Sequence, residues 1–323
     1  MSCKFLETPL SLLRKKICVA GANGMVGQAL ARMLSSEDCE VISLTRDDVD
    51  LRAQQDVSKW LYEYKPDILI VAAAKVGGIY ANSAYPAEFI YDNIMIEANL
   101  IHSAYEVGVE KLLFLGSSCI YPREVEQPIT SESLLAAPLE PTNQYYAIAK
   151  IAGVKMCEAY RKQYGCDFIS AMPCNLYGPG DRYHEENSHV IPALLLKMYK
   201  AKLDNKPSVT LWGSGAPLRE FLYVDDLAQG LIHILKTYSA AEPINIGSGE
   251  EVSIADLAEL VAEVVGYNGD IIFDTDYPDG TPRKLLDSSE VYESGWTACT
   301  SLKNGIHHAY RDFLRQVEQK YAA

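Results

Sequence analysis

Three side chains have the types and the order along the chain of a proton-transfer device. Tyr146 and Lys150 are four residues apart in a helix-period segment, so both fall on one face of that helix. Ser117 follows the short apolar run 112–115, which precedes the helix. We expect the ammonium of Lys150 to lower the pKa of the Tyr146 phenol. A phenol of this kind beside a hydroxyl can protonate a carbonyl during its reduction.

A glycine-rich loop follows the first apolar run, 17–20, and leads straight into a helix-period segment. Its residues 21–27 read GANGMVG, a GxxGxxG spacing. This spacing allows a tight turn, a close approach of backbone to phosphate and close packing of helix on strand, while the amides of the helix N-terminus face an anion. We therefore predict a dinucleotide pyrophosphate site. Its expected contacts are Gly21, Asn23, Gly24, Met25, Val26 and Gly27.

The end of the second apolar run, 41–44, indicates which dinucleotide binds. An NAD-binding fold usually has an acid here for the ribose hydroxyls. This chain has Arg46, whose guanidinium fits a 2'-phosphate. Asp47, Asp48 and Asp50 follow closely and would oppose that phosphate if they pointed inward, and a plain surface arginine is the alternative interpretation. The sequence favours NADP.

Short apolar runs alternate with longer helix-period segments through the first half of the chain. This alternation predicts an α/β fold, a Rossmann-like doubly wound parallel sheet with helices on both faces. Expected strands are 17–20, 41–44, 68–74, 112–115 and 168–172, and expected helices are 25–34, 88–105 and 145–164. After Pro173 the pattern is less regular, with loops at 177–187, 213–217 and 277–282 and helices at 191–202, 254–265 and 301–320.

This change of pattern predicts a second, smaller α/β domain that binds substrate. The cofactor domain is expected over residues 1–178, with a returning segment at 219–247. Within that segment, the strands 221–224 and 244–246 and the helix 225–235 are expected to rejoin the main sheet. The substrate domain is expected over 179–218 and 248–323, and the residues before Lys16 form a short extension.

Composition excludes several classes of partner. The formal net charge of -14 would repel a nucleic-acid backbone or an anionic membrane. No apolar run approaches the length of a membrane span. The eight cysteines form no CxxC pair and no metal-ligand spacing with the six histidines, and no signal peptide precedes them. We expect a cytoplasmic protein with reduced thiols and no metal, which binds a small phosphorylated ligand.

Together these motifs resemble the extended short-chain dehydrogenase/reductase family. The resemblance rests on the glycine loop, on Ser117 four residues before Tyr121, on Tyr146 with Lys150, and on PCNLYGP at 173–179. Further blocks are similar to the branch of the family that forms GDP-L-fucose: AAAKVGGIYAN (72–82), LLFLGSSCIYP (112–122), EPTNQYYAIAKIAG (140–153), NSHVIPALL (187–195), WGSG (212–215), REF (219–221) and DGTPRKLLD (279–287).

The resemblance implies an NADPH-dependent enzyme that epimerises C3 and C5 of GDP-4-keto-6-deoxymannose and then reduces C4. It implies that Ser117, Tyr146 and Lys150 form the reductase set, and that Cys119 and His189 are the acid/base pair of epimerisation. Further implied cofactor contacts are Ala73, Ala74, Lys150, Pro173, Asn175, Leu176 and His189. Implied contacts of the GDP-sugar are Asn175, Lys197, Trp212, Arg219 and Lys284. A homodimer formed by helices of the cofactor domain is implied as well.

The chain departs from the bacterial pattern of this branch at two places. Lys197 stands where that pattern has an arginine, which reduces a bidentate pyrophosphate contact to a single point charge. Ala22 and Asn23 stand where it has a histidine and an arginine, so one phosphate contact is lost. Arg46 must then supply more of any preference for NADP.

Other functions remain open at this point. A 4,6-dehydratase of the family has Asp-Glu directly after the catalytic hydroxyl, where this chain has Ser118 and Cys119, so elimination lacks its acid. A nucleotide-sugar 4-epimerase usually has a threonine or small residue at Cys119 and needs no second acid/base such as His189. A lone cysteine after a strand is also often a packing residue. A non-catalytic NADP-binding regulator is the alternative from another class, and the intact Tyr146 and Lys150 argue against it.

Overall fold

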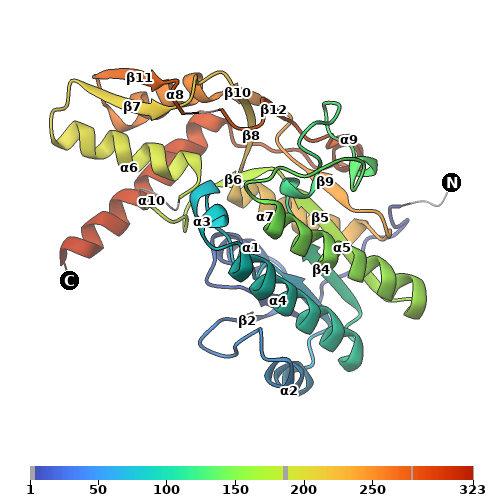
Figure 1. Cartoon of the computed structure of the whole chain (residues 1–323). Coiled ribbons are helices and arrows are strands. Elements are labelled where there is room, and N and C mark those ends of the chain that lie inside the picture. The colour runs from blue at the N-terminus through green and yellow to red at the C-terminus, as the bar shows by residue number, and fades with distance from the viewer. Residues whose placement is uncertain (1–3, 185–187, 278, 323) are drawn as a thin grey trace.

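A six-stranded parallel sheet is the centre of the computed structural model, which describes residues 4–184, 188–277 and 279–322 (Figure 1). Its strands are β1 (Lys16–Ala20), β2 (Glu40–Leu44), β3 (Ile68–Val71), β4 (Lys111–Leu115), β5 (Asp167–Pro173) and β9 (Ile244–Ile246). They lie in the order β2-β1-β3-β4-β5-β9. β3 and β4 are buried along their whole length, as strands with both faces covered must be. The expected parallel α/β sheet is confirmed.

Helices cover both faces of this sheet. On one face α1 (Met25–Leu34) packs against α7 (Val224–Thr237), and on the other α2 (Gln54–Tyr64), α4 (Pro86–Val107) and α5 (Gln144–Tyr164) form a continuous layer (Figure 1). The sequence explains the packing of α7, because its buried leucines and isoleucines recur at helical spacing and form one apolar stripe. The N-terminal segment also packs here, since the amides of Leu6 and Leu10 donate to carbonyls at the end of α7.

A second group of elements, above the main sheet in Figure 1, has its own apolar core. Its strands are β6 (Asn175–Tyr177), β8 (Leu218–Tyr223), β10 (Glu251–Ser253) and β12 (Arg283–Lys284) in one small sheet, and β7 (Ser208–Trp212) paired with β11 (Asp270–Asp274). Its helices are α6 (Val190–Leu203), α8 (Ile254–Val265) and α10 (Leu302–Ala322), which pack on one another. Two short helices complete the α-helices and strands of the described chain. Along the chain, α3 (Ile79–Ala84) lies between β3 and α4, and α9 (Ser289–Glu293) lies between β12 and α10.

The expectation that strand 221–224 rejoins the main sheet is wrong. Residues 221–223 belong to β8, which pairs with β6, β10 and β12 in the small sheet, and Val224 begins α7. Leu222 packs into the core of the main sheet, whereas Phe221 and Tyr223 pack into the second core. A strand buried on both faces reads as a continuous apolar run and does not indicate which sheet it joins. The expected return of 244–246 is correct, because β9 pairs with β5.

The glycine loop and the loop after β3 meet at the carboxyl edge of the sheet. Gly21 has φ +88°, and a Cβ there would lie 2.7 Å from the amide nitrogen of Ala73. A Cβ on Gly27 would lie 2.2 Å from the carbonyl oxygen of Gly21. The expected strand 68–74 therefore ends early, at Val71, because the chain turns there to pass over the loop. β1 and β3 flank the point where strand order reverses, which is where doubly wound sheets bind ligands.

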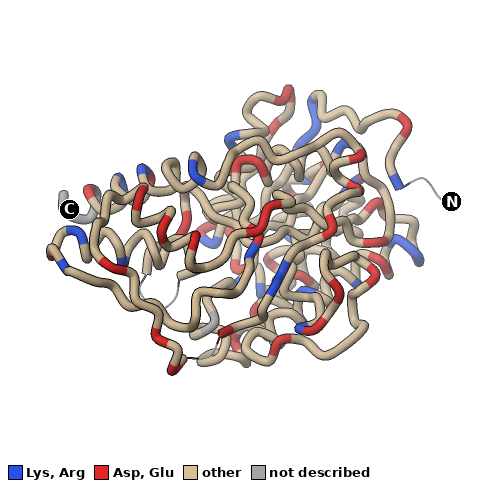
Figure 2. The backbone as a smooth tube through the Cα atoms, turned by 90° about the horizontal axis from the view of Figure 1, so that it is seen from above, with Lys and Arg blue, Asp and Glu red and all other residues tan. Residues whose placement is uncertain are grey.

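Charged residues occur throughout the described chain (Figure 2). Acidic and basic positions are interspersed along the backbone (Figure 2). None of the helices in the described part of the chain is long and apolar enough to cross a membrane. Asn187, in the block 187–195, and Cys3 lie outside the described residues.

Candidate active site

The turn after β4 carries two of the candidate side chains. The chain leaves β4 at Leu115 and forms a short 3-10 turn, η1 (Ser118–Ile120). The hydroxyl of Ser117 caps this turn by accepting a hydrogen bond of 3.2 Å from the amide of Cys119. The cap fixes a hydroxyl and a thiol within two residues of each other at the carboxyl edge of the sheet.

Helix α5 packs on η1 and brings Tyr146 to the same place. The Tyr146 ring meets the ring of Phe89 edge-on, with 6.5 Å between the centroids. Burial raises the pKa of Tyr146 well above its usual range, negative charge on Cys119 and Glu97 raises it further, and the Ser117 hydroxyl opposes the rise. The phenol therefore holds its proton near neutral pH, as a general acid must.

The expectation that Lys150 lowers the pKa of Tyr146 is wrong for this structure. The ammonium of Lys150 lies 2.9 Å from a carboxylate oxygen of Glu97, and both side chains are almost fully buried. Burial of the phenol is the largest cause of the rise in its pKa, and the ammonium is engaged by the carboxylate. Sequence reasoning missed Glu97, although one signal was present. This acid stands on the apolar stripe of α4, one residue from Ile96 and three from Leu100.

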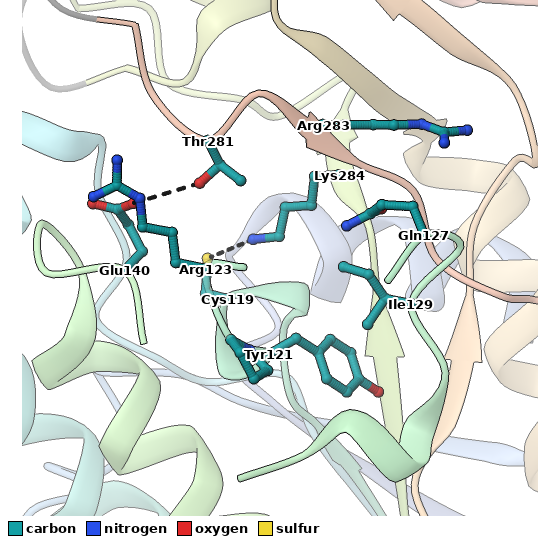
Figure 3. A pocket seen from close by; sticks show the side chains of 10 residues that line it. Cys119, Tyr121, Arg123, Gln127, Ile129, Glu140, Thr281, Arg283 and Lys284 are labelled. Atoms are coloured by element: carbon teal, nitrogen blue, oxygen red, sulfur yellow. Dashed lines mark hydrogen bonds and ion pairs between the residues drawn. The ribbon is translucent and has the colours of Figure 1, made fainter. Parts of the chain in front are cut away.

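The thiol of Cys119 faces two polar donors that come from distant segments. The side-chain amide of Asn143 lies 3.3 Å from the sulfur. The ammonium of Lys284 lies 3.8 Å from it (Figure 3). A small pocket opens here, lined also by Glu140 and Thr281 (Figure 3). The environment of Cys119 differs from that of a cysteine with only a packing role, which lies among apolar groups. An amide and an ammonium, which are both hydrogen-bond donors, are therefore the polar neighbours of this sulfur.

Lys284 and Arg219 form a pair of cations beside this pocket. They are direct register partners in the neighbouring strands β12 and β8. Burial lowers the pKa of Arg219, and the nearby carboxylate of Asp279 opposes that change. Asp279 is itself held by the amide of Ser214 at 2.9 Å and by its hydroxyl at 2.6 Å. Two fixed cations at one level of a sheet suit a diphosphate.

Four other predicted residues make no hydrogen bond to this cluster within the described ranges. Trp212 is exposed and stacks on Tyr277, with 4.5 Å between the ring centroids. Lys197 donates to the carbonyl of Thr210 at 2.7 Å, and Asn175 donates to the carbonyl of Glu220 at 2.8 Å. His189 directly precedes α6. The residue is exposed, and desolvation by nearby protein atoms lowers the pKa of its imidazole, so the ring is neutral near pH 7 and accessible as a base.

The predicted dinucleotide site fits the loop geometry. Gly21 and Gly27 leave no room for a Cβ, whereas Gly24 is exposed and a Cβ there meets nothing closer than 3.3 Å. Ala73 approaches the loop from β3, and Ala74 follows it. Pro173 ends β5, and Leu176 lies in β6. Met25 and Val26 form the first turn of α1, and the carbonyl of Asn23 accepts from a side chain of that helix at 2.8 Å.

Arg46 is exposed in the turn after β2, and two of the three acids near it are engaged elsewhere. The carboxylate of Asp48 accepts from the amide of Thr45 at 2.8 Å and from its hydroxyl at 2.7 Å. Asp50 pairs with Arg52 at 2.9 Å. These partners hold the two carboxylates, although Asp50 lies close enough to interact with the charge of Arg46.

A model of the NAD dependent epimerase/dehydratase family matches residues 17–247, from the first strand of the main sheet to the residue after its last. The chain belongs to this family. The match spans the glycine loop, the turn after β4 and the helix with Tyr146, and it confirms the resemblance to the extended short-chain dehydrogenases/reductases.

Several members of the family are similar to this chain over nearly its whole length. A protein named GDP-L-fucose synthase from Sinorhizobium fredii is 56% identical over 310 residues, which cover 96% of this chain and 99% of that protein. The GDP-L-fucose synthase of Escherichia coli is 48% identical, with 95% and 98% covered. A solved structure of a GDP-L-fucose synthetase from Naegleria fowleri bound to NADP has a TM-score of 0.92 at 29% identity and covers 98% of each chain.

Within the described ranges, no group of three or more His, Cys, Asp and Glu side chains is arranged to hold a metal ion.

The contact between Lys284 and Cys119 predicts a charge effect on thiol reactivity. Lys284→Met should slow alkylation of Cys119 by iodoacetamide several-fold, because the thiolate loses its ammonium partner. Mass spectrometry of the Cys119 peptide measures the rate. Arg283→Met is the matched control, since Arg283 lies on the same strand but pairs with Glu251 at 2.6 Å, and its rate should equal that of the wild type. Equal rates for all three proteins would show that Lys284 does not act on the thiol.

Proposed function

We propose that this chain catalyses the NADPH-dependent conversion of GDP-4-keto-6-deoxy-D-mannose to GDP-L-fucose, by epimerisation at C3 and C5 and reduction at C4. One observation carries the proposal. A thiol surrounded by an amide and an ammonium lies beside the Ser117 and Tyr146 hydroxyl pair, so one site holds two separate proton-transfer groups. The names of relatives 48% and 56% identical to this chain support the same activity.

Reduction needs a hydride at C4 and a proton on the C4 oxygen. The nicotinamide, when bound, supplies the hydride. Tyr146 is the proton donor in this proposal, and its raised pKa supports that role because the phenol is protonated until it is used. Ser117 donates a hydrogen bond to the C4 oxygen, which polarises the carbonyl. Lys150 lies one helical turn further along α5 and binds ribose hydroxyls of the cofactor.

Epimerisation precedes reduction, because it uses the carbonyl that reduction removes. The 4-keto group acidifies the protons on C3 and C5, so a base can remove each one to give an enolate. In this proposal Cys119 and His189 exchange those protons on opposite faces of the ring. The neutral imidazole and the amide and ammonium around the thiol support this pairing. In this proposal Lys284 contacts the thiol of Cys119 as well as the substrate. The resemblance implies only its contact with the substrate.

We propose that the main-sheet residues hold the cofactor and that 179–218 with 248–323, together with β6 and β8 of the small sheet, hold the GDP-sugar. The two apolar cores support this division. The boundary is not simple along the sequence, since Leu286, Val291 and Trp296 pack into the core of the main sheet. Among the substrate contacts that the resemblance implies, we retain Asn175. We assign the diphosphate of the substrate to Arg219 in β8 and Lys284 in β12, which are register partners.

We propose NADPH as the preferred cofactor. Arg46→Ala should raise KM for NADPH about tenfold and leave KM for NADH nearly unchanged, because only NADPH carries the 2'-phosphate. Steady-state kinetics with each cofactor measure this. Arg32→Ala removes another surface guanidinium, one paired with Asp225 at 2.5 Å, and should change neither KM. A similar rise for both cofactors in Arg46→Ala would contradict the assignment.

The two chemistries should separate by mutation. In D2O without NADPH, Tyr146→Phe should still exchange deuterium into C3 and C5 while losing reduction, because the enolate forms before hydride arrives. Cys119→Ala should lower the exchange rate 10²-fold or more, the usual scale of general acid–base catalysis. NMR of the sugar measures exchange, and NADPH absorbance measures reduction.

The matched control for the thiol is Cys166→Ala, a cysteine between α5 and β5 that should exchange like the wild type. Exchange at the wild-type rate in Cys119→Ala would refute the role of the thiol. Turnover of a UDP-sugar in place of the GDP-sugar would favour the 4-epimerase alternative.

We also propose a homodimer that forms through α4 and α5, and a cytoplasmic location. The paired helices present exposed Tyr91, Ile148 and Tyr164, and Tyr164 stacks on Tyr105 with 4.3 Å between the centroids. Such an apolar and aromatic face is typical of an interface. The seven described cysteines are free thiols, which supports a reducing compartment.

Sedimentation velocity at micromolar concentration should therefore show a dimer for the wild type and a monomer for Ile148→Glu/Tyr164→Glu, because two buried charges disfavour the interface. Tyr62→Glu, on exposed α2, should remain a dimer. A wild-type monomer, or a dimer that the double variant leaves intact, would rule out this interface.

A further inference from the structure

A buried carboxylate lies directly behind the cation pair of the small sheet. Glu220 follows Arg219 in β8, and successive residues of a strand point to opposite faces of its sheet. Arg219 therefore faces one side of the small sheet, together with its register partner Lys284, and Glu220 faces the other side. The side chain of Glu220 is fully buried there.

Backbone amides from two other segments bind this carboxylate. One oxygen accepts a hydrogen bond of 2.8 Å from the amide of Gly249, in the connection between β9 and β10. The other oxygen accepts a hydrogen bond of 3.1 Å from the amide of Leu286, two residues after Lys284. Burial raises the pKa of Glu220, and these amides oppose the rise. The carboxylate thus ties β8 to the segment that follows β12.

Further contacts keep Glu220 in this position. A Cβ on Gly247 would lie 2.1 Å from the oxygen that binds Gly249, so a side chain at residue 247 would displace the carboxylate. The side-chain amide of Asn175 in β6 donates to the backbone carbonyl of Glu220 at 2.8 Å. Residue 220 is therefore bonded to β6, to the connection before β10 and to the segment after β12.

The strand β12 is too short to specify its own register. It consists of Arg283 and Lys284, and it pairs with β8 over these two residues. A slip of one residue in this pairing would turn Lys284 to the other face of the sheet. The hydrogen bond from Leu286 to Glu220 holds the chain just beyond β12 and so opposes such a slip.

We propose that Glu220 is a positioning residue for the diphosphate of the substrate, which fixes Lys284 at the level of Arg219 by binding the backbone beyond β12. This inference rests on the proposed assignment of the diphosphate to these two cations. Glu220 acts through its backbone partners, because it is buried on the face opposite the cations. A pair of cations held at a fixed spacing loses little freedom when it binds two phosphates, so a displaced β12 should weaken the contact with the second phosphate.

Glu220→Gln in the NADP-bound enzyme tests the proposal. The carboxamide keeps the shape of the carboxylate but has only one acceptor oxygen for the amides of Gly249 and Leu286. Calorimetry measures the dissociation constants of GDP and of GMP, which differ by one phosphate. The advantage of GDP over GMP should fall about tenfold, the scale of one charge-assisted hydrogen bond, while the affinity for GMP changes little.

A double-mutant cycle tests whether Glu220 acts through Lys284. Lys284→Met should itself lower the advantage of GDP over GMP, because it removes one of the two cations. In that background Glu220→Gln should lower it little further, since the side chain that Glu220 positions is gone. Two full and additive losses would show that Glu220 does not act through Lys284 and would overturn the proposal.

Two further variants separate this role from a merely structural one. Asp226→Asn alters another buried carboxylate, which lies at the start of α7 and accepts from the amide of Thr300 at 2.8 Å. It should lower the melting temperature and leave the advantage of GDP over GMP unchanged. Glu220→Asp keeps the charge but is one methylene shorter, so it should also reduce that advantage. It serves as the test if Glu220→Gln fails to fold.

An unchanged advantage of GDP over GMP in Glu220→Gln would refute the positioning role, as would an unchanged advantage in Glu220→Asp where that variant takes its place. These results are distinct from failure of the proposed function. If Lys284→Met kept the full advantage of GDP, the assignment of the diphosphate itself would be wrong. If Lys284→Met lost it while Glu220→Gln kept it, only the role of Glu220 would be wrong.

Discussion

The burial of the parallel sheet on both faces is the constraint on which the rest of the structure depends. Strands such as β3 and β4 are buried from end to end and offer no position for a solvated polar group. Polar chemistry is therefore confined to the carboxyl edge, where each strand passes into a loop. The glycine loop, the loop at Ala73 and the turn at Ser117 all lie along this edge. Gly21 permits the first two to meet, because any side chain there would collide with backbone.

The small sheet supplies what this edge lacks, which is positive charge. β8 and β12 bring Arg219 and Lys284 to one level, and Lys284 reaches a thiol 165 residues away in the sequence. A buried carboxylate holds these strands together. Glu220 in β8 accepts from the amide of Gly249 at 2.8 Å and from that of Leu286 at 3.1 Å. The position of the two cations therefore depends on backbone hydrogen bonds rather than on flexible side chains alone.

The electrostatics of the site are local and differ from those of the whole molecule. A chain with a net charge of -14 would repel an anionic nucleotide at long range. At short range, acids near the proposed phosphate contacts are engaged, Asp48 by Thr45 and Asp279 by Ser214. Glu97 forms a buried ion pair with Lys150 at 2.9 Å. Each of these arrangements sets the charge that a ligand meets within a few ångströms, where Coulomb interactions are strongest.

The sequence by itself determined the parallel sheet, the glycine loop and the identity of the main chemical groups, because buried strands, helix N-termini and i,i+4 pairs leave local patterns. Only the tertiary structure decided which sheet β8 joins, that Asn143 and Lys284 surround Cys119, and that Glu97 rather than the phenol is the partner of Lys150. These features depend on contacts between segments far apart in the chain. Burial, which sets the protonation of Tyr146, is a property of the packed core and has no local signal.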